Sequence, residues 1–413
     1  MSSAPPARRI KFVFVNRYFD PDQSATSQML TDLARGLVAR ACDVHVVCSR
    51  QLYTDAGARL PPRQDMSGVA VHRVATTRFG RAGLIGRAVD YASFYISSVG
   101  ALLMLLKAGD VLIAKTDPPL FSVPAAVVAR LKRVQLVNWQ QDVFPETASQ
   151  LAANPLPRWL DPWVRRVRDW SMRRAKMNVL IGHRMFEYFR GRGVPSSRLC
   201  VIENWSDTAA IRPKAAASSA LRARLGLDER FVVGYSGNLG RAHEFQTLLA
   251  AAEALRSDPS IVFLMIGGGA NMEPLRRAVL ARSLNNFLFL PYQPRDALED
   301  SLAAADVHLV SLLPALEGLI MPSKLYGILA AGRPIVFVGD ADGEIARIVG
   351  GARCGVTVAV NAGGDLAEQI RRLQSEPGTR SGMGTRAREI AATRYGVDKA
   401  VERWIQVLGA AQP

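Results

Sequence analysis

The stretch from Leu290 to Ile345, LPYQPRDALEDSLAAADVHLVSLLPALEGLIMPSKLYGILAAGRPIVFVGDADGEI, is the most informative part of the chain. Its pattern predicts a strand over Asp306–Ser311, a helix over Ser323–Ala331 and a second strand over Ile335–Val338. A helix N-terminus with free backbone N–H groups, beside a lysine and a small hydroxyl, favours an anion. A carboxylate just upstream can bind sugar hydroxyls. These features predict a pocket for a sugar attached to phosphate.

Short apolar runs alternate with helical patterns on both sides of this stretch. Examples are the predicted helices Ala25–Arg40 and Met272–Ala281 and the predicted strand Phe287–Leu290. Strands that alternate with helices indicate parallel sheets with right-handed crossovers. We therefore expect an α/β protein with two doubly wound, Rossmann-like domains, over residues 1–208 and 209–394, which face each other across a cleft. The polar, alanine-rich segment Asp207–Arg224 is the expected linker, and residues 395–413 should form a helix that packs back on the first domain.

Composition excludes several classes of protein. The chain has 413 residues, of which 49% are hydrophobic, enough for two domains. Its 4 cysteines and 5 histidines show no disulfide framework and no metal-ligand spacing, which argues against a zinc site. We also expect no cofactor. The short polar leader MSSAPPARR is not a secretory signal.

The net charge of +16 predicts an acidic partner. Basic and aromatic residues are mixed between Arg158 and Arg192, which fits a membrane surface. A solvated helix face is the plainer alternative, and nucleic acid is disfavoured because no nucleic-acid motif accompanies the cluster. The apolar run Ala92–Leu106 is shorter than the roughly 20 residues of a spanning helix, so a buried or monotopic helix is expected there.

Six segments together resemble the family-4 glycosyltransferases of the GT-B fold, in particular the subgroup that builds bacterial capsule, O-antigen and colanic-acid-type polysaccharides. In chain order they are NRYFDPDQSATSQMLTDLARGL, NWQQDVFPE, VIENWSD, GYSGNLGRAHEFQTLL, FLMIGGGANMEPL and EGLIMPSKLYGILAAGRP. The resemblance covers nearly the whole chain. It implies a retaining, metal-independent transfer of a hexosyl or N-acetylhexosaminyl group from a nucleotide sugar, with the donor on the second domain and the acceptor on the first.

The resemblance assigns the donor to loops that follow strands of the second domain. The expected contacts are Gly237, Asn238, Arg241 and His243 in the first loop, Gly267 and Gly268 in the second, and Tyr292 and Gln293 in the third. Asn238 and His243 stand where many relatives carry arginine and lysine, and Arg241 is expected to supply a cation for the diphosphate. The plainer alternatives are a polar tight turn with a solvated Arg241 for the first loop, a plain turn for the second and a loop with a packed tyrosine for the third.

Glu317, Ser323 and Lys324 complete the expected donor site. Many relatives have a second glutamate that contacts the ribose, and Gly327 stands in its place here, so the ribose must be held in a different way or by a neighbour such as Glu344. A lysine in the first turn of a helix opposes the helix dipole unless an anion is present. That conflict favours a bound phosphate over a plain surface lysine.

The acceptor side is expected around Asp142, which follows a buried strand and could position or deprotonate the acceptor hydroxyl. Glu146 is the second candidate there. Ser24 and Thr26 are expected to meet the acceptor or the leaving phosphate, although capping of the first helix explains that segment equally well.

These expectations describe a transferase with Asp142 and Glu317 as catalytic residues. His243, Arg241 and Lys324 would stabilise the charge that develops on the leaving diphosphate. The expected partners are a nucleotide sugar, a polyprenyl-diphosphate-linked saccharide and the cytoplasmic face of a membrane. Two competitors are a nucleotide-sugar 2-epimerase of the same architecture and a non-catalytic scaffold subunit. A Rossmann dehydrogenase is disfavoured because no G-x-G-x-x-G follows the first strand.

Overall fold

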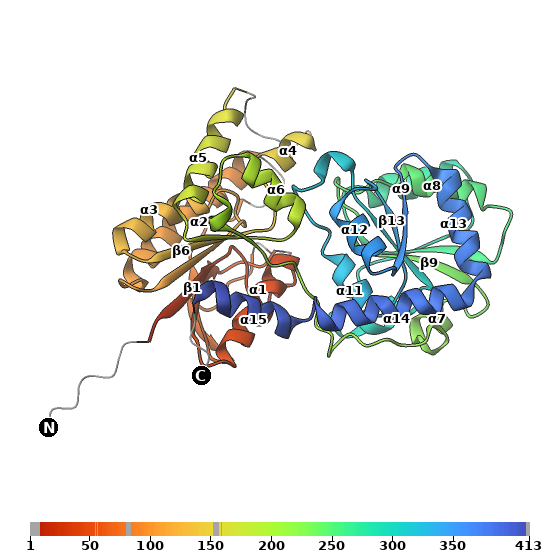
Figure 1. The fold of residues 1–413 in the computed structure, drawn as a ribbon, viewed down its shortest axis with the longest axis horizontal. Coiled ribbons are helices and arrows are strands. Elements are labelled where there is room, and N and C mark those ends of the chain that lie inside the picture. Colours follow the sequence, from red (N-terminus) through yellow and green to blue (C-terminus); the bar gives the residue numbers. More distant parts are fainter. Residues whose placement is uncertain are drawn as a thin grey trace. The chain divides into compact units, whose positions relative to one another are not determined.

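The computed structural model describes residues 9–53, 55, 57–79, 84–151, 157 and 159–409. The chain divides into two compact units (Figure 1): unit 1 is Met1–Glu203 with Ala400–Pro413, and unit 2 is Asn204–Lys399. The observed crossings between units therefore lie five residues from the expected boundaries at 208/209 and 394/395. The first eight residues of the polar leader, and Arg158, lie outside the described residues.

Unit 1 is built on a sheet of eight strands in the order β3-β4-β2-β1-β5-β6-β7-β8. All neighbours are parallel except β3 and β4. The strands are β1 (Lys11–Val15), β2 (Asp43–Ser49), β3 (Arg63–Met66), β4 (Val69–Val74), β5 (Val111–Lys115), β6 (Gln135–Gln140), β7 (Met177–Leu180) and β8 (Leu199–Val201). The central strands are continuous apolar runs because helices cover both faces of the sheet.

The helices of unit 1 are α1 (Ala25–Val38), α2 (Leu84–Leu105), α3 (Ser122–Lys132), α4 (Glu146–Gln150), α5 (Asp161–Arg174) and α6 (His183–Gly191). Phe94 and Leu102 of α2 pack with Phe121 and the inward side chains of β1 and β5 in one core cluster. The helix α2 begins before, and ends one residue before, the apolar run Ala92–Leu106 that the sequence singles out.

The last helix, α15 (Val397–Leu408), completes the core of unit 1. Its buried residues Ala400, Val401, Trp404, Ile405 and Leu408 recur at the spacing of one helix face. The Trp404 ring lies edge-on to Trp139 of β6 with the centroids 4.9 Å apart, and 6.5 Å from Phe14 of β1. This segment therefore fills a place that no residue of the first 203 occupies.

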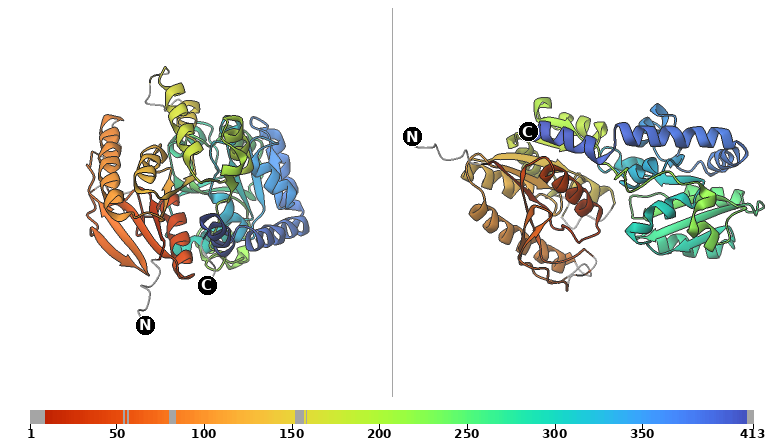
Figure 2. Two further views of the ribbon diagram at one scale, coloured as in Figure 1. Left: turned by 60° about the vertical axis from the view of Figure 1, so that its left-hand side comes forward. Right: turned by 90° about the horizontal axis from the view of Figure 1, so that it is seen from below.

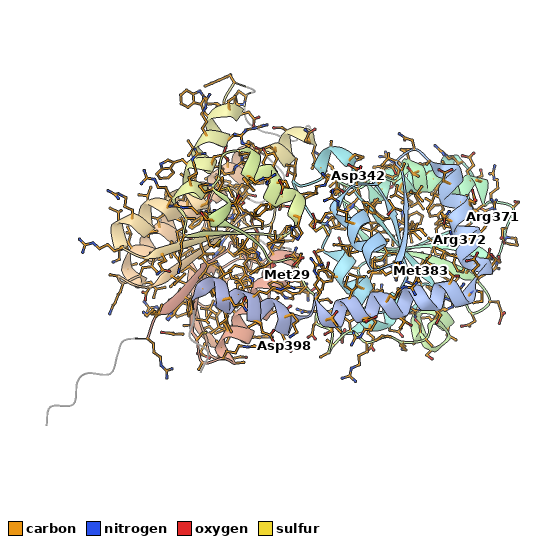
Figure 3. All side chains as sticks on the ribbon, viewed as in Figure 1. Met29, Asp342, Arg371, Arg372, Met383 and Asp398 are labelled. Carbon is orange, nitrogen blue, oxygen red and sulfur yellow. The ribbon has the colours of Figure 1, made fainter. Side chains whose placement is uncertain are left out.

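Unit 2 is built on a fully parallel six-stranded sheet in the order β11-β10-β9-β12-β13-β14. The strands are β9 (Phe231–Asn238), β10 (Ile261–Gly268), β11 (Phe287–Leu290), β12 (Val307–Ser311), β13 (Ile335–Val338) and β14 (Gly355–Val358). The helices are α7 (Ala220–Arg224), α8 (Gln246–Ala254), α9 (Met272–Ala281), α10 (Leu298–Ala303), α11 (Lys324–Ala330), α12 (Glu344–Gly351), α13 (Gly363–Ser375) and α14 (Pro377–Thr393). They cover both faces of the sheet (Figure 2), and Met383 of α14, labelled in Figure 3, is part of the core.

The expected linker Asp207–Arg224 belongs to unit 2 and is not a free connection. The Ser219 hydroxyl accepts a hydrogen bond from the backbone N–H of Arg222 and caps α7. The Arg222 guanidinium in turn pairs with Asp306, 2.9 Å away, at the start of β12. These two polar contacts tie the segment to the sheet.

Candidate donor and acceptor sites

In unit 2, β9 and β10 end side by side at a pair of glycines, where the backbone of this edge of the sheet carries no side chains. Gly267 pairs with Gly237 across the two strands, and both have positive φ angles, 128° and 117°. A Cβ atom on Gly267 would overlap the carbonyl group of Gly237. Glycine is therefore required at this edge, which leaves the backbone accessible to a ligand.

The loop that follows β9 is held in place by Asn271, a residue that the sequence analysis did not single out. Its backbone N–H donates to the Leu239 carbonyl at 2.9 Å, and its side-chain amide donates to the carbonyls of Gly240 (3.2 Å) and His243 (3.0 Å). Asn271 stands just before α9 but makes no capping hydrogen bond with its side chain, which anchors this loop instead.

Lys324, at the start of α11, directs its ammonium group to the same edge. The Nζ atom donates to the Asn238 carbonyl at 3.0 Å and to the Tyr235 hydroxyl, and it lies 3.8 Å from the centroid of the Tyr235 ring. Desolvation by burial lowers the pKa of Lys324 well below that of a free lysine. The ammonium thus has protein partners, so its place in the first helical turn is not by itself evidence for a phosphate.

His243 holds Lys324 from the other side. Its Nδ1 atom lies 2.6 Å from the Ser311 carbonyl, which can only accept, so Nδ1 carries the proton. The other nitrogen, Nε2, is then a lone-pair acceptor 3.4 Å from the Lys324 ammonium. Burial, and next the Lys324 charge, lower the pKa of His243 to about 3. The neutral ring therefore positions the lysine, and a contact of His243 with the diphosphate stays a prediction.

The other expected donor residues surround this edge. Arg241 is exposed and forms no hydrogen bond or ion pair within the described part of the chain, so its guanidinium is available to a ligand. Tyr292 is exposed, and its ring lies against the position that a side chain on Gly268 would occupy. Gln293 donates its amide to the Pro291 carbonyl at 2.9 Å.

Ser323 occupies the cap position of α11 but makes no capping hydrogen bond with its side chain.

Glu317 has a structural task that the sequence did not reveal. Its Oε2 atom accepts a hydrogen bond from the backbone N–H of Glu344 at 3.1 Å, at the first residue of α12. A Cβ atom on Gly343 would overlap this carboxylate. Glu317 therefore caps α12, and a contact with donor sugar stays a prediction. The position of Gly327 has room, since a Cβ there would come no closer than 3.8 Å to Leu302.

A second cluster lies in unit 1 at the ends of β5 and β6. Asp142 and Lys115 line a small recess that is open to solvent, together with Arg168. Lys115, 2% exposed, donates to the Thr26 carbonyl at 2.5 Å and lies 3.9 Å from the centroid of the Trp139 ring. Burial lowers the pKa of Lys115 to about 7.

Desolvation by the surrounding protein, and next the Asp117 carboxylate, raise the pKa of Asp142 to about 6, and the Lys115 charge opposes that rise. The Asp142 side chain nevertheless has access to solvent. A carboxyl group that titrates near neutrality can exchange a proton with a hydroxyl group. The structure thus brings the expected residues Asp142 and Thr26 together around Lys115, a residue that the sequence analysis did not single out. The signal for Lys115 was a single cation at the end of an otherwise apolar strand.

The two other acceptor-side candidates have structural partners. Glu146 is buried, its carboxylate pairs with Arg168 and it accepts a hydrogen bond from the Tyr188 hydroxyl. Both N–H and hydroxyl of Ser24 donate to the Asp22 carboxylate, at 2.8 and 2.5 Å. Ser24 occupies the N-cap position of α1, but its side chain makes no capping hydrogen bond because its hydroxyl donates to Asp22.

No group of three or more His, Cys, Asp or Glu side chains within the described ranges could hold a metal ion. Asp342, labelled in Figure 3, lies just before α12, where its backbone N–H donates to the Asp340 carboxylate at 2.9 Å.

Comparisons with known proteins agree with this architecture. Residues 24–205 match the family model described as glycosyl transferase 4-like domain, and residues 218–390 match the one described as glycosyl transferases group 1. The solved structure of Anabaena Alr3699/HepE in complex with UDP and glucose is similar at a TM-score of 0.73, with 17% identity, over 98% of this chain and all of that one. The expected GT-B fold is confirmed, and each half of the chain matches a glycosyltransferase family model.

Two curated relatives align with part of the chain. The putative colanic acid biosynthesis glycosyl transferase WcaI of Escherichia coli (strain K12) is 33% identical over 159 residues, 38% of this chain and 39% of that protein. The probable glycosyltransferase WbjE of Pseudomonas aeruginosa is 26% identical over 244 residues, 58% of this chain and 60% of that protein. The alignments thus span less than two thirds of either relative.

Proposed function

We propose that this protein is a retaining glycosyltransferase that moves a sugar from a nucleotide sugar to a lipid-linked saccharide during the synthesis of a bacterial surface polysaccharide. The observation that carries the proposal is the cation at the glycine edge of unit 2. Lys324 lies beside Asn238 and over Tyr235, next to backbone that only glycine permits. Such an arrangement suits a diphosphate, which backbone amides and one or two cations can hold.

The chemistry then follows from charge. The leaving nucleoside diphosphate gains negative charge as the glycosidic bond breaks, and a cation fixed in place beforehand stabilises that charge without reorganisation. Lys324, positioned by the neutral His243 ring, and the exposed Arg241 supply this stabilisation. Asp142, with a pKa of about 6, is the group that we expect to orient or deprotonate the acceptor hydroxyl. Two cations at the diphosphate would make a divalent metal unnecessary.

The names of similar proteins support the donor and the pathway class. HepE was solved with UDP and glucose, and WcaI is named for colanic acid biosynthesis. We therefore expect a UDP-sugar donor first, and a saccharide on a polyprenyl diphosphate at the cytoplasmic face of the membrane as acceptor.

Calorimetric titration with UDP-, GDP- and dTDP-sugars, followed by transfer assays on lipid-linked acceptors, tests the proposal. We expect one nucleotide series to bind and the anomeric configuration, read by NMR, to be retained in product made in the presence of EDTA. If no nucleotide sugar binds, the proposal fails. Binding with turnover of the donor in the absence of any acceptor would indicate an epimerase, and binding without transfer to any acceptor would indicate a scaffold.

A further inference from the structure

Helix α2 has an apolar face on its solvent side. Ile96 and Met104 are 75% and 83% exposed, and Val89 and Leu103 are exposed as well. Between residues 88 and 104 the only charged residue is Asp90, which is buried. The opposite side of the helix, which includes Phe94 and Leu102, lies in the core of unit 1. A helix that is apolar on both sides is ordinarily covered on both sides.

Helix α5 presents tryptophan and arginine together. Trp163, Val167 and Trp170 are exposed and recur at the spacing of one helix face. The guanidinium groups of Arg166 and Arg174 lie over the rings of Trp163 and Trp170, with 5.4 and 5.5 Å to the ring centroids. Tryptophan and arginine are the side chains that settle at the level of lipid headgroups.

Helix α3 packs against both α2 and α5 and so joins them into one side of unit 1. The Ser122 and Ser171 hydroxyls share a hydrogen bond of 2.8 Å between α3 and α5, and Lys132 of α3 donates to the Leu103 carbonyl of α2 at 2.8 Å. The exposed residues of α3 include Val127 and Leu131. Most of the large apolar side chains that the described residues expose therefore lie on or next to this side, which we call the α2–α3–α5 face.

We propose that the α2–α3–α5 face docks on the surface of an anionic lipid bilayer. Apolar and cationic groups occur together on this face, since Lys107, Arg130 and Arg173 are exposed at its edges and the chain carries a net charge of +16. A bilayer that contains anionic lipid satisfies both kinds of group. A second copy of the chain would bring the same positive charge against this face and be repelled.

The depth of docking follows from the inner side of α2. The window Gly86–Leu105 is long and apolar enough to cross a membrane. However, Asp90 is buried, accepts a hydrogen bond from the Thr77 hydroxyl at 2.7 Å and lies 3.7 Å from the Arg17 guanidinium. To span a bilayer, α2 would have to leave the core and break these contacts. The helix therefore lies in the plane of the interface, with Ile96 and Met104 at the boundary of headgroups and acyl chains.

Vesicle sedimentation of the full chain tests this proposal, and its outcome is independent of transferase activity. We expect binding to vesicles of phosphatidylcholine with phosphatidylglycerol and much weaker binding to phosphatidylcholine alone. The double variant Arg173→Gln/Arg174→Gln should bind the anionic vesicles roughly 30-fold more weakly, because each basic residue near the surface contributes about a fivefold gain. The matched control Arg276→Gln/Arg277→Gln, on α9 of unit 2, should bind as the parent does.

The apolar contribution needs its own pair of variants. Ile96→Ser should weaken the binding that persists at high salt, whereas Leu280→Ser, at a residue of α9 that is 72% exposed, should not. Quenching of tryptophan fluorescence by brominated lipid should decrease in Trp163→Phe. Absence of binding to anionic vesicles, or equal effects of the α9 variants, would overturn the proposal. So would a dimer in solution that Ile96→Ser dissociates, because the occupant of the face would then be a second copy.

Discussion

Replacement of Lys324 by methionine separates ligand binding from stability. Methionine keeps the length and apolar stem of the side chain but removes the ammonium next to Asn238 and Tyr235. A hydrogen bond to a charged group contributes about 1.5–3 kcal/mol. If Lys324 contacts the diphosphate, the Kd for the nucleotide sugar should rise by roughly 10- to 150-fold.

The same substitution should leave the stability of the folded protein unchanged or raise it, although it weakens ligand binding. Burial places the pKa of Lys324 in the folded protein well below that of an unfolded lysine. The unfolded chain therefore holds this proton more tightly than the folded protein does, and this preference lowers the free energy of unfolding at every pH below the unfolded pKa. This penalty shrinks as the pH rises from the folded pKa towards the unfolded value of about 10.4 and vanishes above it. The thermal midpoint of Lys324→Met at neutral pH should be equal to that of the parent or higher.

Isothermal titration calorimetry and thermal unfolding of the same preparations provide both numbers. Arg277→Met, which removes an exposed cation from α9, is the matched control and should change neither. Titration of the parent in two buffers of different ionisation enthalpy should also show proton uptake on binding at alkaline pH, because the diphosphate restores the charge of Lys324. An unchanged Kd in Lys324→Met would refute the diphosphate contact, and weaker binding with a lower thermal midpoint would show that the lysine acts through the fold.

Three further predictions concern other parts of the molecule. The kcat/KM for transfer should fall below about pH 6, as Asp142 becomes protonated. Lys115→Met removes the cation that lowers the pKa of Asp142, so it should shift this acid limb of the pH profile to higher pH. Gly267→Ala should reduce the free energy of unfolding by at least about 1–3 kcal/mol in denaturant titrations, because the φ angle of Gly267 is 128° and a Cβ atom would overlap backbone. Its control, Gly364→Ala, lies in the first turn of α13 where a Cβ atom meets no neighbour, and it should leave the free energy of unfolding unchanged or raise it slightly. Trp404→Ala should cost about 3–5 kcal/mol in the unfolding of unit 1, followed by the near-ultraviolet circular dichroism of its aromatic cluster, and a smaller loss would mean that α15 contributes little to that core.

Local sequence signals predicted some elements to the residue. The helix Met272–Ala281 and the strands Phe287–Leu290 and Ile335–Val338 have the predicted bounds. Each is a strongly periodic or wholly apolar segment with clear punctuation at its ends. The helix α14 was missed because three glycines interrupt its pattern. It is helical through packing, in which the absent side chain of Gly384 lets the Gly332 carbonyl approach.

The site was predictable only where one segment carries the whole signal. Lys324 and the glycines, which the structure brings to one edge, could be singled out because their loops are distinctive on their own. The neutral state of His243 depends on the Ser311 carbonyl, which is 68 residues away in the chain, and the partner of Lys324, Tyr235, is 89 residues away. No local pattern encodes such pairings. For the same reason the helix-capping role of Glu317 became visible only in the folded unit.

The return of α15 to unit 1 has a consequence for biosynthesis. Unit 1 needs Trp404 beside Trp139 and Phe14, but about 200 residues of unit 2 are translated between Glu203 and that helix. At 5–20 residues per second a ribosome takes roughly 10 to 40 s to cover this distance. During that time the nascent first half exposes the groove that α15 will fill, and it must be shielded by chaperones or by fast folding of the remaining core. Fragments that stop before Ala400 should therefore aggregate on expression, however well their own strands pair.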